Sequence, residues 1–81
     1  MIYTMEVEQS PSFDEGIDWY NSCLVDLKNS LISLLGVEEV KITDGKFFEF
    51  ETQLNIGEIK KIMKPVFSYH IDDFRMTKLF N

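Results

Sequence analysis

The longest regular pattern in the chain is a stripe of apolar residues spaced alternately four and three residues apart. This spacing places side chains on one face of an α-helix, which we expect to face the core. Ser12 and Glu15 have the spacing of a capping box, and Gly36 is a typical helix end. One helix over residues 13–35 is therefore predicted. Its stripe consists of Phe13, Ile17, Tyr20, Leu24, Leu27, Leu31 and Leu34.

Three shorter segments have the two-residue alternation of β-strands. The first covers residues 2–8. The other two, residues 37–43 and 46–52, flank the dipeptide Asp44-Gly45. This dipeptide favours a type I′ hairpin turn, because that turn needs positive φ at both central positions.

The last third of the chain begins with a second capping pair, Asn55 and Glu58, which predicts another helix. Pro65 is expected to end this helix. The continuation is ambiguous: residues 66–71 and 74–80 both resemble strands, or the helix continues past a kink at Pro65. We expect at least one strand here, with Met76 and Phe80 buried.

The predicted order is strand, helix, strand, strand, helix, strand. It is typical of the ferredoxin-like, split β-α-β arrangement. We therefore predict a single α+β domain over residues 1–81, with an antiparallel sheet, both helices on one face and a possible extra C-terminal strand. In this topology the first and third strands lie side by side in the centre of the sheet.

Four glutamates share one predicted face of these two central strands. Glu6 and Glu8 alternate with apolar residues in the first strand, as Glu49 and Glu51 do in the third. Like charges that face each other across strands destabilise a sheet, so we interpret this face as a surface for a basic partner. Trp19, on a part of the long helix expected to overhang the sheet, is predicted to add an apolar contact.

The net charge of −6 is unevenly distributed. Residues 1–55 hold eleven acids and three bases (−8), whereas residues 56–81 hold three acids and five bases (+2). An acidic body repels phosphates, so we expect no direct binding to nucleic acid. The segment GKFFEFET invites comparison with the aromatic segment of RNA-recognition domains, but Phe48 and Phe50 are expected to face the core.

The remaining composition favours a cytoplasmic protein. The chain has no apolar run long enough to span a membrane, and its first residues do not have the pattern of a signal peptide. We expect no membrane contact.

No catalytic constellation is recognisable. The only cysteine, Cys23, and the only histidine, His70, fall in different predicted elements. His70, Asp72 and Asp73 form the one cluster of metal-ligating residue types, but a structural site needs about four ligands. We expect no enzyme and no cofactor; a small metal-dependent enzyme that uses these three residues is the least favoured alternative.

The sequence thus predicts a non-enzymatic protein-binding module, an inhibitor or regulator that docks on a basic, nucleic-acid-binding surface of a partner protein. In size, charge and lack of catalytic residues it resembles phage and mobile-element inhibitors, including anti-CRISPR proteins and DNA mimics. The resemblance implies an acidic surface that occupies a groove evolved for phosphates. The alternative is a homodimeric structural or regulatory module.

Overall fold

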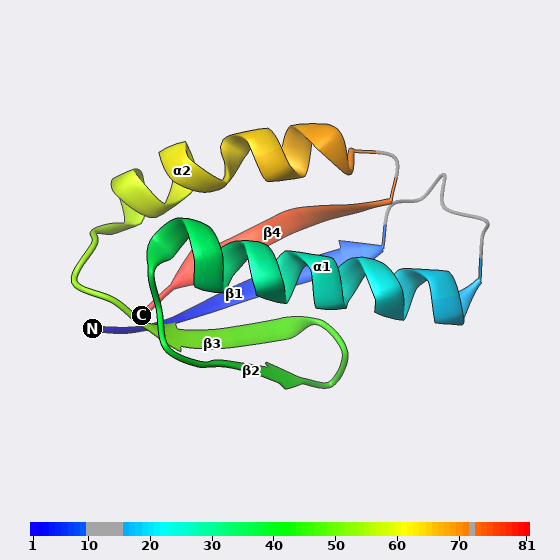
Figure 1. Ribbon diagram of the computed structural model, residues 1–81, viewed down its shortest axis with the longest axis horizontal. Coiled ribbons are helices and arrows are strands. Elements are labelled where there is room, and N and C mark those ends of the chain that lie inside the picture. Colours follow the sequence, from blue (N-terminus) through cyan, green and yellow to red (C-terminus); the bar gives the residue numbers. More distant parts are fainter. Residues whose placement is uncertain (10–15, 72) are drawn as a thin grey trace.

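In the described part of the chain, four strands and two helices follow one another in the order β-α-β-β-α-β (Figure 1). The computed structural model describes residues 1–9, 16–71 and 73–81, and within them every side chain except that of Ile17. The elements are β1 (Ile2–Gln9), α1 (Ile17–Leu35), β2 (Val40–Thr43), β3 (Phe47–Glu51), α2 (Ile56–Tyr69) and β4 (Phe74–Phe80). This is an α+β domain, as predicted.

The four strands form one antiparallel sheet in the order β2-β3-β1-β4. The first and third strands are therefore its central pair, which confirms the prediction. Their register places Tyr3 opposite Phe50 and Met5 opposite Phe48.

One face of the sheet is covered by both helices. Tyr3, Met5 and Val7 of β1 are at most 1% exposed, and buried residues of α1 and α2 join them in a single cluster. Alternate residues of the strands point to the other face, which no helix of the described part covers. The buried cluster consists of Tyr3, Met5, Val7, Tyr20, Cys23, Leu24, Leu27, Leu31, Leu35, Val37, Val40, Phe48, Phe50, Ile59, Met63 and Phe74.

Helix α1 begins at Ile17 rather than at residue 13. Gly16 has φ of 94°, outside the helical range, and stands at the N-cap without a side-chain hydrogen bond. Phe13 and the predicted capping pair, Ser12 and Glu15, lie outside the described residues.

The predicted core stripe of α1 is confirmed over its middle and fails at its end. Tyr20, Leu24, Leu27 and Leu31 are buried, but Leu34 is 50% exposed and Leu35 is buried in its place. A strict seven-residue repeat drifts by about 20° per heptad on a helix with 3.6 residues per turn. A step of four residues from Leu31 to Leu35 corrects this drift and keeps the helix on the core.

The predicted hairpin is confirmed at Asp44 and Gly45, whose φ angles are 57° and 65°. The Lys46 amide donates to the Thr43 carbonyl at 3.2 Å across the turn. Both strands are shorter than the alternation suggested.

Helix α2 begins at the predicted capping box. The Glu58 amide donates to Asn55 Oδ1 at 2.9 Å, and the Asn55 amide donates to Glu58 Oε1 at 3.1 Å. The expectation that Pro65 ends this helix is wrong, because α2 continues to Tyr69. Beyond the proline, Val66 and Phe67 pack against the core, and this packing offsets the backbone hydrogen bond that proline removes.

Strand β4 is the only strand after α2, so the described part of residues 66–71 forms no extra strand. A register shift opposite Glu6 and Val7 changes the side-chain alternation of β4. Met76 is half-buried on the core side, Leu79 replaces the next expected core position, and Phe80 is 46% exposed. The prediction that Phe80 is buried is therefore wrong.

A matched pair of leucines in α1 tests the observed orientation of this helix. Leu27 has no exposed surface, so Leu27→Ala is expected to lower the free energy of unfolding by about 2–5 kcal/mol through the cavity it leaves. Leu34→Ala should change it by less than about 0.5 kcal/mol. Equal losses for the two variants in urea denaturation would contradict this orientation.

Candidate functional site

The open face of the sheet carries charged side chains from all four strands. Its charged residues are Glu6 and Glu8 of β1, Lys41 of β2, Glu49 and Glu51 of β3, and Arg75 and Lys78 of β4. The four predicted glutamates do share this face.

The strand register nevertheless separates these glutamates from one another. Glu49 stands between Thr4 and Lys41, and Glu51 stands opposite Ile2. No register pair of the described sheet sets one glutamate directly against another. The prediction that these glutamates face one another across neighbouring strands is therefore wrong. Glu6 and Glu49 are diagonal neighbours instead.

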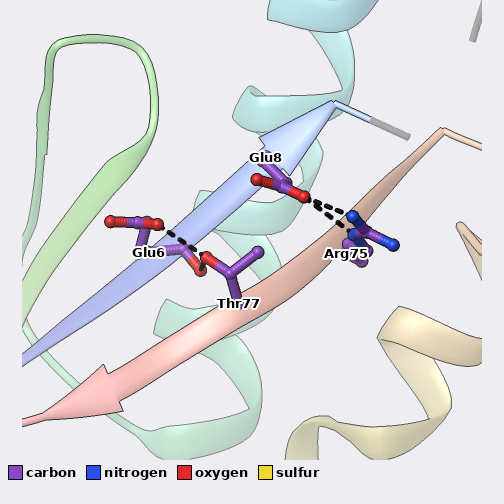
Figure 2. A network of polar contacts seen from close by, with 4 residues as sticks. All are labelled: Glu6, Glu8, Arg75 and Thr77. Atoms are coloured by element: carbon purple, nitrogen blue, oxygen red, sulfur yellow. Dashed lines mark hydrogen bonds and ion pairs between the residues drawn. The ribbon is translucent and has the colours of Figure 1, made fainter. Parts of the chain in front are cut away.

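Strand β4 supplies partners for the two glutamates of β1 (Figure 2). Arg75 donates from Nε and from a terminal nitrogen to Glu8 Oε1, at 2.9 and 2.6 Å. The Thr77 hydroxyl donates to Glu6 Oε1 at 2.8 Å, and Lys78 lies opposite Glu6 in register. The excess negative charge therefore lies on the β3 side of the face.

An open hollow of about 760 Å³ lies at this β3 side, where the end of α1, the start of β2 and the end of β3 meet. Among the described residues, four carboxylates line it together with one cation, so these side chains carry −4 + 1 = −3; they are Glu38, Glu39, Glu49, Glu51 and Lys41. The other lining residues are Ile2, Leu35, Gly36, Val37, Phe50, Thr52, Gln53 and Leu54.

The backbone adds to this negative charge. Leu35 and Gly36, at the C-terminus of α1, line the hollow, and the last turn of the helix contains no basic residue. Carbonyl groups at a helix C-terminus carry a partial negative charge and favour cations. The hollow is thus suited to a positively charged side chain.

Two of the three aromatic residues of β3 offer no stacking surface to solvent. Phe48 and Phe50 are at most 2% exposed, as predicted. Phe47 is half-buried, and Lys46 Nζ lies 5.0 Å from its ring centroid.

Trp19, the fifth predicted contact residue, does not lie on the open face. It is 53% exposed near the N-terminus of α1, on the layer that covers the other side of the sheet. Figure 1 shows these first turns of α1 beyond the end of β1, which agrees with the expected overhang. The structure thus brings the four glutamates to one face and leaves Trp19 apart.

Cys23 and His70, the only cysteine and the only histidine of the chain, lie close together, although they belong to separate elements. Atoms of Cys23, His70 and Asp73 that can ligate a metal lie within 4.8 Å of one another. Cys23 belongs to α1, His70 caps α2, and Asp73 directly precedes β4. Asp72, the remaining member of the predicted cluster, lies outside the described residues.

The surroundings of Cys23 keep its thiol protonated at neutral pH. Burial raises its pKa above the ordinary value of 9.0, and the carboxylates of Asp73 and Asp26 raise it further. Burial likewise raises the pKa of Tyr20 above 10.0, with smaller contributions from Glu8 and Cys23. An unassisted Cys23 thiolate nucleophile is therefore disfavoured.

Sequence reasoning missed Glu38 and Glu39 of the hollow and the proximity of Cys23 to His70. A signal existed for the first pair, because Glu38-Glu39 directly follows the helix end at Gly36-Val37. No local signal links Cys23 to His70, since the two residues are 70 − 23 = 47 positions apart.

Comparisons with protein-family models, curated proteins and solved structures found no match to this chain. Within the described residues, neither helix has the length and apolar character needed to cross a membrane.

The ion pair on the open face generates a prediction about stability. Glu8→Gln should lower the free energy of unfolding by up to about 1 kcal/mol, because it removes an exposed pair with Arg75. Glu51→Gln should leave this free energy unchanged or raise it, since Glu51 faces Ile2 and adds to the excess of negative charge. Urea denaturation at low and high salt measures both; a larger loss for Glu51→Gln would contradict this assignment of partners.

The raised pKa of Tyr20 predicts a loss of stability at alkaline pH. The folded state holds the phenolic proton to higher pH than the unfolded state, so the contribution of Tyr20 is complete below pH 10.0 and is lost as the pH rises through the folded pKa. The slope is at most about 1.4 kcal/mol per pH unit for one group. Tyr20→Phe should flatten the decline, because it removes the phenolic proton from the linkage. Identical pH profiles for wild type and Tyr20→Phe would contradict this linkage.

Proposed function

We propose that this chain is a non-enzymatic protein-binding module whose acidic hollow receives lysine or arginine side chains of a partner protein. The observation that carries the proposal is the set of described residues around the hollow, four carboxylates and one lysine, beside the C-terminus of α1. The β-α-β-β-α-β order and the strand order β2-β3-β1-β4 support its assignment to the ferredoxin-like class.

The negative charge of the hollow favours basic side chains of a partner protein as its occupants. A carboxylate binds a guanidinium group through charge-assisted hydrogen bonds, and several carboxylates around one hollow can engage more than one basic side chain. Glu49 and Glu51 are exposed and have no ion-pair partner among the described residues, so they remain available to a partner. Glu6 and Glu8 are already engaged by Thr77 and Arg75, and we assign them to the rim of the surface.

The partner surface in this proposal is one that ordinarily binds phosphates. Basic nucleic-acid-binding grooves present clusters of arginine and lysine, and a preformed set of carboxylates competes for such a groove. We therefore propose that the chain acts as an inhibitor or regulator of a nucleic-acid-binding protein. A cytoplasmic location, where Cys23 stays reduced, is part of this proposal.

The homodimer alternative has less support. The exposed lysines of α2, Lys60, Lys61 and Lys64, could meet the acidic hollow of a second copy. Such a contact gives a closed dimer only if it forms twice about a two-fold axis, whereas a single contact of this kind adds copies head to tail. Mass measured over a range of concentrations distinguishes the two arrangements.

Two charge-neutralising double variants test the proposal. The immobilised chain is incubated with the heparin-binding proteins of its source organism, and bound proteins are identified and quantified along a salt gradient. Glu49→Gln with Glu51→Gln should reduce capture of a basic partner by about tenfold or more at low salt. Asp18→Asn with Asp44→Asn removes the same charge away from the hollow and should reduce capture by less than about twofold.

The direct interaction is then measured with the purified partner. Its affinity for wild type should fall steeply with salt, and the partner should release a bound oligonucleotide when the chain is added. If both double variants bind the partner as wild type does, the acidic hollow is not the interface and the proposal is wrong.

A further inference from the structure

We propose that Cys23, His70 and Asp73 form a binding site for a zinc ion, which joins α1 to the junction between α2 and β4. One ligand atom from each residue lies within 4.8 Å of the other two. The cluster lies outside the acidic hollow and does not contribute to it. This site is independent of the proposed partner-binding function.

The donor set is specific in its chemistry. A thiolate and an imidazole select borderline-soft divalent ions such as Zn²⁺ over Mg²⁺ and Ca²⁺, which prefer oxygen ligands. Three protein ligands leave the fourth tetrahedral position for water. When the ion binds, the Cys23 sulfur exchanges its proton for a bond to zinc and the proton passes to solvent.

The fold holds the ligands in place before any ion arrives. The His70 ring stacks on Phe74, with centroids 4.8 Å apart and planes at 21°, and packs edge-on against Tyr69. His70 Nδ1 lies 3.1 Å from Asp73 Oδ2. The amides of Asp73 and Phe74 both donate to the His70 carbonyl, at 2.8 and 3.0 Å, and so fix the tight turn that carries two of the ligands.

The three ligands differ in their exposure to solvent. Cys23 is only 3% exposed, whereas the side chains of His70 and Asp73 are 14% and 28% exposed. The thiol is thus the most deeply buried of the three ligands, and the imidazole and the carboxylate are accessible to an ion from solvent. Neighbouring tetrahedral zinc ligands are about 3.3–3.6 Å apart, and the present separations of at most 4.8 Å come within reach of this range through small side-chain rotations.

The local charge also favours a cation. Asp26 and Asp73 both act electrostatically on the Cys23 sulfur, which places two carboxylates near a buried sulfur atom. A divalent ion balances the Cys23 thiolate and the Asp73 carboxylate. The competing interpretation is that His70 and Asp73 form only a hydrogen-bonded pair that closes the turn before β4.

The test uses the untagged full chain, stripped of metal with a chelator under reducing conditions. Co²⁺ is added first, because cobalt bound to a thiolate gives a sulfur-to-metal charge-transfer band in the near ultraviolet. We expect this band to saturate at one ion per chain and to disappear when Zn²⁺ displaces the cobalt. Zn²⁺ should also raise the melting temperature, since it binds the folded state. If the wild-type chain shows no such band in excess Co²⁺, the proposal is wrong.

Three variants assign the ligands. Cys23→Ser should abolish the band, and His70→Asn should weaken zinc binding by about tenfold or more. Asp73→Asn should keep the band but weaken binding by a similar factor. Asp26→Asn changes an exposed carboxylate near the same sulfur and should alter the zinc affinity by less than about threefold. Zinc binding by Cys23→Ser or His70→Asn at wild-type affinity would overturn the assignment, and circular dichroism checks that each variant is folded.

Discussion

The structure depends on the burial of one face of β1 in the middle of the sheet. Tyr3, Met5 and Val7 are at most 1% exposed and contact both the neighbouring strands and the helical layer. Because strand side chains alternate, the same backbone sends Glu6 and Glu8 to the opposite face. A shift of one residue would exchange the two faces, so the register of β1 determines both the core and the chemistry of the open surface.

The open face owes its charge distribution to the two edge strands. Strand β4 supplies partners for the carboxylates of β1: Arg75 pairs with Glu8, and the Thr77 hydroxyl donates to Glu6. The bulge in β4 brings both Thr77 and Lys78 beside Glu6. Strand β2 contributes only Lys41 as a cation, while Glu38 and Glu39 precede it. The negative excess therefore gathers at the end of the sheet where α1 terminates, and the helix C-terminus strengthens it.

Helix α1 links the two candidate sites. Its C-terminal residues border the acidic hollow, and Cys23, in its second turn, faces the junction between α2 and β4. Packing of Leu27 and Leu31 in the core fixes the rotation of the helix between these points. The geometry of either site therefore depends on the same hydrophobic contacts, although the sites use different chemistry.

Local sequence determined the features that depend on neighbouring residues. The alternation of β1, the positive φ angles at Asp44 and Gly45, and the capping box of Asn55 and Glu58 each follow from contacts within a few positions, so the element order and most of the core could be predicted.

Only the tertiary structure decided which residues meet across elements. The continuation of α2 past Pro65 needed the packing of Val66 and Phe67, and the exposure of Phe80 needed the bulge against β1. Likewise, Lys78 opposite Glu6 and Cys23 beside His70 result from packing between segments far apart in sequence, because the relative position of two elements is set by the whole core and not by the residues that it brings together.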